Sequence, residues 1–99
     1  EYDRRRRFLY TSFNRIGLTC FEPKGAFYIM PSVAALQMTG EEFAAKLIEE
    51  ERVAVVPGSA FGESGEYFVR CSYATSMQNL VEAMRRIEKF VKRHKGGSR

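Results

Sequence analysis

The stretch from Glu66 to Tyr73 constrains the fold more than any other, because it has the composition of a β-strand and carries an arginine near its centre. Side chains on a strand alternate between its two faces. One face, which we predict to be buried, carries Tyr67, Val69, Cys71 and Tyr73, and the other carries Phe68, Arg70 and Ser72. An unpaired buried guanidinium is costly, so Arg70 needs a carboxylate, a phosphate, carbonyl groups or water as its partner.

Length and composition indicate one ordinary globular domain. The 99 residues are enough for a single modest hydrophobic core but not for two. Hydrophobic residues make up 44% of the chain and charged residues 28%, a balance that argues against disorder. No apolar run approaches the roughly 20 residues needed to cross a bilayer, and the charged N-terminus does not resemble a secretory signal. We therefore expect a cytoplasmic protein with no membrane contact.

The residue types present disfavour metal and nucleic-acid binding. Cys20, Cys71 and the single histidine, His94, provide too few nitrogen and sulfur ligands for a zinc site. We expect both cysteines to be buried thiols, with a disulfide or a reactive Cys71 beside Arg70 as the alternatives. The net charge is +4, but half of the sixteen basic residues lie near the chain ends, as on solvated helix faces, and no nucleic-acid-binding motif accompanies them.

Hydrophobic periodicity predicts helices at both ends of the chain. In the first, from Glu1 to Ile16, apolar residues recur every three or four positions, and Gly17 is a natural C-cap. Residue 1 carries no capping signal, which suggests that the sequence begins inside a longer helix of a larger protein. The last helix begins at Thr75 or Ser76, and residues 96–99 are expected to be a disordered tail. The apolar stripe of this helix is Leu80, Ala83, Met84, Ile87, Phe90 and Val91.

A third helix is predicted from Thr39 to about Glu51. Thr39 and Glu42 have the spacing of a capping box, and Met38 and Phe43 that of a hydrophobic staple. The predicted buried face is Phe43, Ala44, Leu47 and Ile48. The glutamates at its two ends are expected to form a solvated face rather than a catalytic carboxylate pair; they are Glu41, Glu42, Glu49, Glu50 and Glu51.

Three further segments have the composition of strands, namely residues 18–21, 26–30 and 53–56. The segment from Ala26 to Met30 is apolar on both faces and ends at Pro31, so we expect it to be central and covered on both sides. Residues 57–65 contain three glycines, as expected for a loop with unusual backbone conformations. This loop lacks the lysine-containing motif of a phosphate-binding P-loop.

The order of these elements predicts an α+β fold, in which helices pack on one face of a small, mostly antiparallel sheet. Arg70 would then lie on the face opposite the helices. Because Phe68 and the segment from Ala26 to Met30 make that face apolar, we expect it to meet a protein surface outside this chain.

From spacing alone, Arg70 has two interpretations. An arginine fixed in an apolar cleft binds a carboxylate through its planar fork. The alternative is an internal ion pair with a glutamate such as Glu66, or an arginine on a strand at the surface. No pair of residues in the sequence provides both a nucleophile and a base for catalysis.

Three motifs follow one another along the chain: residues 23–28 (PKGAFY), residues 55–62 (VVPGSAFG) and residues 69–74 (VRCSYA). In this order and at this spacing they resemble the C-terminal small domain of class I/II aminotransferases, the fold type I enzymes that use pyridoxal phosphate. The likeness is greatest to the aspartate-aminotransferase-like branch, and it extends over residues 1–95.

This resemblance implies a parent enzyme that transfers an amino group between an amino acid and a 2-oxo acid. Arg70 would bind the substrate α-carboxylate, and Gly25, Phe27, Tyr28 and Phe61 would lie at the pocket or the domain interface. The cofactor lysine of the family belongs to the large domain, so this chain alone is expected to be inactive and to bind neither pyridoxal phosphate nor metal. The expected partners are the large domain and a second subunit of a homodimer.

Two alternatives remain open. The same domain occurs in pyridoxal-phosphate lyases and synthases, which also bind an α-amino acid. A freestanding ligand-binding or interaction module with an exposed sheet is the other alternative.

Overall fold

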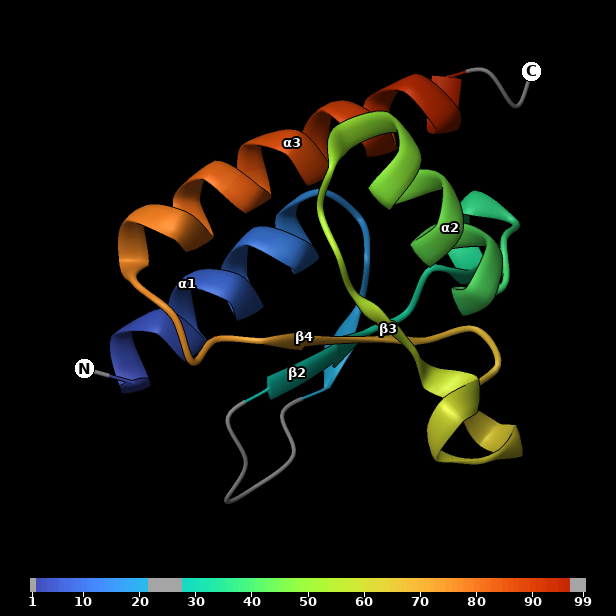
Figure 1. Cartoon of the computed structure of the whole chain (residues 1–99), viewed down its shortest axis with the longest axis horizontal. Coiled ribbons are helices and arrows are strands. Elements are labelled where there is room, and N and C mark those ends of the chain that lie inside the picture. Colours follow the sequence, from blue (N-terminus) through green and yellow to red (C-terminus); the bar gives the residue numbers. More distant parts are fainter. Residues whose placement is uncertain (1, 22–27, 97–99) are drawn as a thin grey trace.

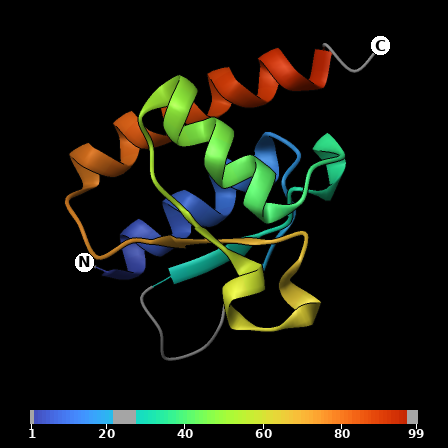
Figure 2. The same cartoon turned by 45° about the vertical axis from the view of Figure 1, so that its right-hand side comes forward.

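A computed structural model describes residues 2–21 and 28–96, and in this part of the chain three α-helices cover one face of a four-stranded sheet (Figures 1 and 2). The α+β prediction is therefore confirmed. The helices are α1 (Tyr2–Arg15), α2 (Gly40–Glu51) and α3 (Met77–Gly96). The strands are β1 (Cys20–Phe21), β2 (Tyr28–Pro31), β3 (Val56–Pro57) and β4 (Val69–Ser72). Three short 3-10 helices, η1 (Ala34–Leu36), η2 (Gly58–Phe61) and η3 (Glu63–Gly65), complete the described elements.

The sheet has the strand order β1-β2-β4-β3, and its described pairings are antiparallel. Ile29 pairs with Cys71 across β2 and β4, and Pro57 pairs with Val69 across β3 and β4. Directly paired residues share a face of the sheet, so these four lie on the same face. Ile29 and Val69 are fully buried, which identifies this face as the one beneath the helices.

The caps predicted from the sequence mark the starts of α2 and α3, and their predicted apolar stripes supply most of the side chains that these helices bury. Thr39 and Glu42 form the complete capping box of α2. Ser76, rather than Thr75, caps α3, because its Oγ accepts a hydrogen bond of 3.1 Å from the backbone N–H of Asn79. Gly17, which follows α1, has a φ of 94°, a conformation that favours glycine. Among the described helices, none has an apolar stretch of the length that a bilayer requires.

The core lies between the helices and the sheet. Phe43 of α2 meets Phe90 of α3 edge-on, with ring centroids 5.2 Å apart. The largest fully buried side chains come from all three helices, from β2 and β4, and from the segments between them; they are Phe13, Phe43, Phe90, Leu18, Ile29, Leu47, Val33, Val69 and Val91. All of the predicted stripe of α3 is buried except Ala83, which is half-buried.

Two residues predicted to be buried are exposed. Tyr67 is 45% exposed because it lies in a turn before β4, where the alternation of a strand does not apply. Ile48 is 49% exposed because the buried line of α2 follows four-residue steps through Phe43, Leu47 and Glu51. Ile48 is one residue away from that line, and the helix turns it outward.

The strands are shorter than predicted, and their ends differ. β4 covers four residues of the predicted 66–73, and β3 consists of Val56 and Pro57 alone. β2 ends at Pro31 and β3 at Pro57, and each proline is still paired, Pro31 with Cys20 and Pro57 with Val69. α3 extends to Gly96, one residue into the predicted tail, and residues 97–99 lie outside the described part.

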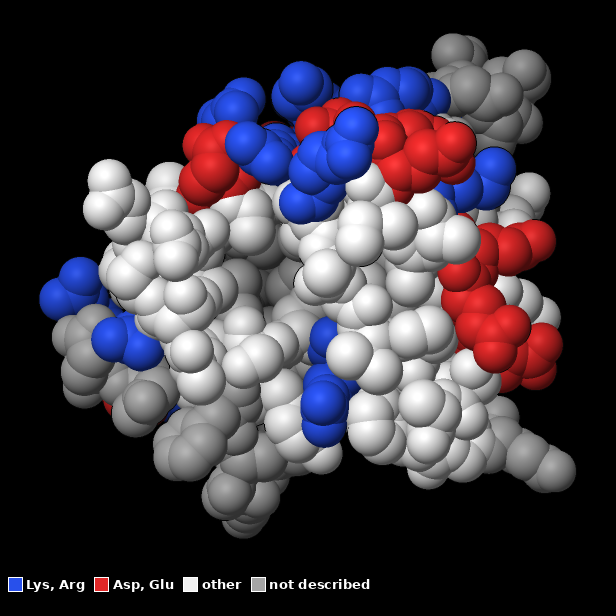
Figure 3. All heavy atoms as spheres, viewed as in Figure 1, with Lys and Arg blue, Asp and Glu red and all other residues white. Residues whose placement is uncertain are grey.

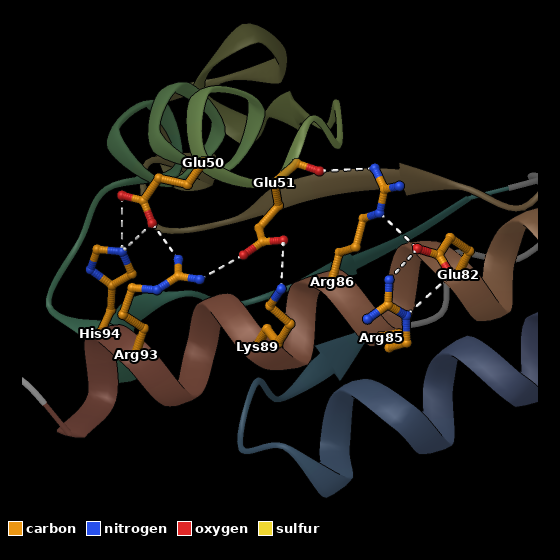
Figure 4. A network of polar contacts seen from close by, with 8 residues as sticks. All are labelled: Glu50, Glu51, Glu82, Arg85, Arg86, Lys89, Arg93 and His94. Carbon is orange, nitrogen blue, oxygen red and sulfur yellow. Dashed lines mark hydrogen bonds and ion pairs between the residues drawn. The ribbon is translucent and has the colours of Figure 1, made fainter.

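Of the five glutamates predicted to form a solvated face, only Glu51 is buried, and the others are exposed as predicted. Glu50 and Glu51 join the end of α2 to α3 through the polar network of Figure 4. Arg93 donates to Glu50 Oε1 at 2.6 Å and to Glu51 Oε2 at 2.7 Å. The Glu51 side chain is only 7% exposed, so it needs these partners. The hydrogen bond from Arg93 holds the pKa of Glu51 below its ordinary value. The pKa of Glu50 is lowered mainly by its hydrogen bond with His94, and to a smaller extent by the one with Arg93.

Close backbone packing joins the loop after β3 to the start of β4. The backbone N–H of Gly58 donates to the carbonyl of Phe68 at 2.7 Å. A Cβ on Gly58 would lie 2.4 Å from the oxygen of Gly65, and a Cβ on Gly65 would lie 2.3 Å from the oxygen of Gly58. Gly40, the first residue of α2, approaches the Phe68 carbonyl in the same way. No larger residue fits these positions unless the backbone moves.

This packing predicts that Gly58→Ala lowers the free energy of unfolding by about 1–3 kcal/mol, since a methyl group would overlap a carbonyl oxygen that cannot move independently. Chemical denaturation followed by circular dichroism measures this change. Ser64→Ala, an exposed substitution in the same loop, is the control and should have little effect. Equal stability of Gly58→Ala and the wild type would show that the loop adjusts freely.

The network between α2 and α3 predicts that Arg93→Met lowers the melting temperature at pH 7, because the Glu51 carboxylate then retains only the ammonium of Lys89, at 3.9 Å, among its described ion-pair partners. Both glutamates have depressed pKa values in the folded state, so their contribution is present above the ordinary glutamate pKa. It disappears as the pH falls below about 4.5.

Melting curves from pH 7 to pH 3 test this expectation, with Arg85→Met as the control. The described hydrogen bonds and ion pair of Arg85 are with Glu82, within α3. The difference between Arg93→Met and the wild type should shrink as the pH falls. A difference that is constant with pH, or no larger than that of the control, would contradict the role assigned to Arg93.

Candidate functional site

Arg70 lies on the face of the sheet that the helices leave uncovered. Val56 is its pairing partner on β3, and Tyr28 of β2 pairs with Ser72, two residues further along β4. Since paired residues share a face, Tyr28, Val56, Arg70 and Ser72 lie together on this side. Arg70 is half-buried, whereas its neighbours on β4, Val69 and Cys71, are buried beneath the helices. The predicted alternation in β4 is therefore confirmed.

Two aromatic rings contact the guanidinium of Arg70. The Cζ atom lies 5.0 Å from the ring centroid of Tyr28 and 4.6 Å from that of Phe61. Both distances are within the range of cation–π attraction. Tyr28 comes from β2 and Phe61 from η2, so three separate elements build this cluster. In Figures 1 and 2, the segment from Gly58 to Gly65 lies on the side of the sheet away from the helices, as this arrangement requires.

Arg70 has no carboxylate partner among the side chains that the structure describes. The predicted alternative of an ion pair with Glu66 is wrong, because Glu66 is exposed and makes no such contact. In Figure 3 most charged side chains in view lie over the helices and at the two sides of the molecule, and a small basic patch lies among uncharged side chains at its centre. A half-buried guanidinium that contacts two rings retains its hydrogen-bond donors for a carboxylate or another oxyanion.

Cys71, next to Arg70 in the sequence, is not part of this cluster. Its side chain is buried on the helix side, and Cys20 is buried as well. Burial raises the pKa of the Cys71 thiol far above its ordinary value, and the neighbouring Cys20 adds to the shift. Both cysteines are thus buried thiols, as predicted, and the alternatives of a disulfide and of a reactive Cys71 are wrong.

The structure brings together three of the five predicted site residues. Tyr28 and Phe61 contact Arg70, whereas Gly25 and Phe27 lie outside the described residues. Val56, which pairs with Arg70, was not predicted as part of the site. The alternation of side chains along residues 53–56 could have assigned Val56 to one face of a strand. Only the pairing register of β3 with β4 shows that Val56 and Arg70 lie on the same face of the sheet.

The described residues do not form a cofactor or metal site around Arg70. Lys46 lies on α2, and Lys89, Lys92 and Lys95 lie on α3, all on the helix side of the sheet. None of these lysines shares the face of Arg70, so none fits as the lysine that holds pyridoxal phosphate. Among the described residues, no group of histidine, cysteine, aspartate and glutamate side chains has the arrangement of a metal site.

The sequence and the fold both match known aminotransferases. Residues 1–87 match the family model described as aminotransferase class I and II. The chain is 50% identical over 95 residues to an aspartate aminotransferase of Pyrococcus abyssi, with 96% of this chain and 24% of the relative covered. It is 48% identical over 95 residues to the aromatic-amino-acid aminotransferase 2 of Thermococcus litoralis, with the same 96% and 24% covered.

A solved structure shows the same relationship. The crystal structure of an aromatic aminotransferase from Pyrococcus horikoshii superposes with a TM-score of 0.91 at 49% identity, and the match covers 96% of this chain and 25% of that one. The chain thus spans about a quarter of the length of the relatives that it matches. Because the family model matches most of the residues, and because the fold agrees with a solved member, the chain belongs to the class I and II aminotransferase family.

Proposed function

We propose that residues 1–95 are the C-terminal small domain of a pyridoxal-phosphate-dependent aminotransferase, and that Arg70 binds the α-carboxylate of its substrates. The enzyme transfers an amino group between an amino acid and a 2-oxo acid. Family membership supports the reaction class. The observation that carries the role of Arg70 is its position: half-buried between β2, β3 and η2, beside two rings, with no acidic partner among the described side chains.

The chemistry of arginine fits this role. Its guanidinium is planar, remains charged at any relevant pH, and matches a carboxylate through two parallel hydrogen bonds. Amino acids and 2-oxo acids differ at the carbon that exchanges the amino group but share the adjacent carboxylate. One arginine therefore serves both halves of the reaction.

The uncovered face of the sheet is the surface that we assign to the large domain. Val56 is 37% exposed and Phe61 is 53% exposed on this face, although both are apolar. Closure of the large domain against them would exclude water from the bound carboxylate and strengthen its pairing with Arg70. Gly25 and Phe27, close to Tyr28 in the sequence, complete the proposed pocket or interface.

Pyridoxal phosphate, when bound, supplies the electron sink for the amino-group transfer. The described lysines do not fit its site, so we assign the cofactor lysine to the large domain and propose that this chain alone is inactive. The proposal includes a homodimer, as the family resemblance implies. It also includes a cytoplasmic location.

The substrates belong to the classes in the names of the relatives, aspartate and aromatic amino acids. This chain does not distinguish between them, because Arg70 contacts the carboxylate that all amino acids share. A panel of the twenty standard amino acids as donors, with 2-oxoglutarate as acceptor, identifies the preferred donor of the full-length enzyme.

The proposal predicts that Arg70→Lys in the full-length enzyme lowers kcat/KM for the preferred donor by roughly 30- to 900-fold, while cofactor binding, followed by absorbance, is retained. The loss corresponds to about 2–4 kcal/mol, because lysine provides a point charge in place of a fork with two parallel donors. Arg52→Lys is the matched control, since Arg52 is exposed and its side chain makes no described contact.

Unchanged turnover in Arg70→Lys would contradict the proposal that Arg70 binds the substrate carboxylate. Product analysis with the wild type separates the reaction classes: a transaminase forms a new amino acid from 2-oxoglutarate, whereas a lyase or synthase does not. Tight binding of amino acids by this chain alone, measured by calorimetry, would instead indicate a freestanding binding module.

A further inference from the structure

We propose that Phe61 is a positioning residue for Arg70, which sets the affinity for the substrate carboxylate by holding the guanidinium with its ring. This inference rests on the proposed function, because it assumes that Arg70 binds that carboxylate. It goes further by assigning to Phe61 an action through Arg70, rather than a contact with the substrate or with the large domain.

The guanidinium of Arg70 is held differently from those of Arg86 and Arg93. Arg93 is held by two carboxylates, at 2.6 Å and 2.7 Å. Arg86 donates to Glu82 at 2.8 Å and to the carbonyl of Glu51 at 3.1 Å. Those contacts position a guanidinium but use its donors and offset its charge. The rings of Tyr28 and Phe61 position the guanidinium of Arg70 and leave both donors and charge for a ligand.

The segment that carries Phe61 is anchored to two other elements of the fold. η2 begins at Gly58, whose backbone N–H donates to the Phe68 carbonyl two residues before Arg70. Ser59 donates from its Oγ to Glu41 Oε2 of α2 at 2.9 Å. The backbone N–H of Gly62 donates a hydrogen bond to the carbonyl of Ser59 at 3.3 Å. Phe61 thus lies on a short helix that is hydrogen-bonded to the residues before β4 and to α2, although its own side chain is 53% exposed.

The two rings also reduce the conformational entropy that Arg70 loses when a ligand binds. A long side chain on a strand loses rotamer freedom when it binds a ligand, and that loss weakens binding. Rings that hold the guanidinium before the ligand arrives reduce this loss. Tyr28 lies on β2, whose pairing with β4 fixes it beside Arg70. Phe61 belongs to a separate element, so its substitution removes one support of the guanidinium and leaves the sheet intact.

A double-mutant cycle in the full-length enzyme tests this inference, with Phe61→Leu, Arg70→Gln and the double variant. Leucine retains apolar bulk but removes the ring. With the preferred donor of the amino-acid panel, Phe61→Leu should raise KM about 5- to 30-fold and change kcat less, from the usual strength of a cation–π contact. In the Arg70→Gln background, the same substitution should have almost no further effect.

Two more variants separate positioning from general damage. Phe61→Tyr retains the ring and should restore KM to within about twofold of the wild type, because tyrosine offers a comparable ring face. Tyr10→Leu removes an exposed aromatic ring from α1, on the helix side, and should leave KM unchanged. Melting curves of all variants verify that each is folded.

The outcomes are distinguishable. If Arg70→Gln leaves KM and kcat/KM unchanged, the proposed function fails, and this inference fails with it. If Arg70→Gln weakens the reaction but Phe61→Leu does not, only the role of Phe61 is overturned. An equal effect of Phe61→Leu with and without Arg70 would also overturn it, because Phe61 would then act on the substrate or the fold directly.

Discussion

The pairing register of β4 with its two neighbours is the constraint on which the site depends. Val69 and Cys71 lie beneath the helices because Pro57 and Ile29 are their pairing partners. The residue between them, Arg70, must then point to the opposite face, since successive side chains on a strand alternate. A shift by one residue would place the guanidinium in the core, where it would find only apolar neighbours. The packing that builds the core thus also directs the arginine outward.

Arg70 and the arginines between α2 and α3 have different environments. Arg93 and Arg86 bind acidic or carbonyl groups and join the two helices, together with the contacts of His94 to Glu50 and Lys89 to Glu51. Arg70 contacts two rings and no described acidic group. The same side chain therefore joins helices where its charge is matched, and is proposed to bind a ligand where its charge is left unmatched.

The chain belongs to the class I and II aminotransferase family, and the geometry gives a physical reason for the part that we propose for Arg70. Sequence similarity extends along nearly the whole chain but covers about a quarter of each relative. Within this quarter, the described residues include Arg70, which we propose binds a carboxylate, but no lysine on the same face of the sheet. An enzyme that divides binding and chemistry between two domains can couple closure of the domains to the expulsion of water.

The sequence by itself determined the α+β class, the capping box of α2, the apolar stripe of α3 and the alternation that separates Arg70 from Val69 and Cys71. These are local properties, which depend on neighbours within a few residues. The tertiary structure alone decided that Tyr67 and Ile48 are exposed, that Glu51 is buried against Arg93, and that Tyr28, Phe61 and Arg70 meet. Contacts between distant segments depend on strand register and on close approach of backbones, as at Gly58 and Phe68, and neither leaves a periodic signal in the sequence.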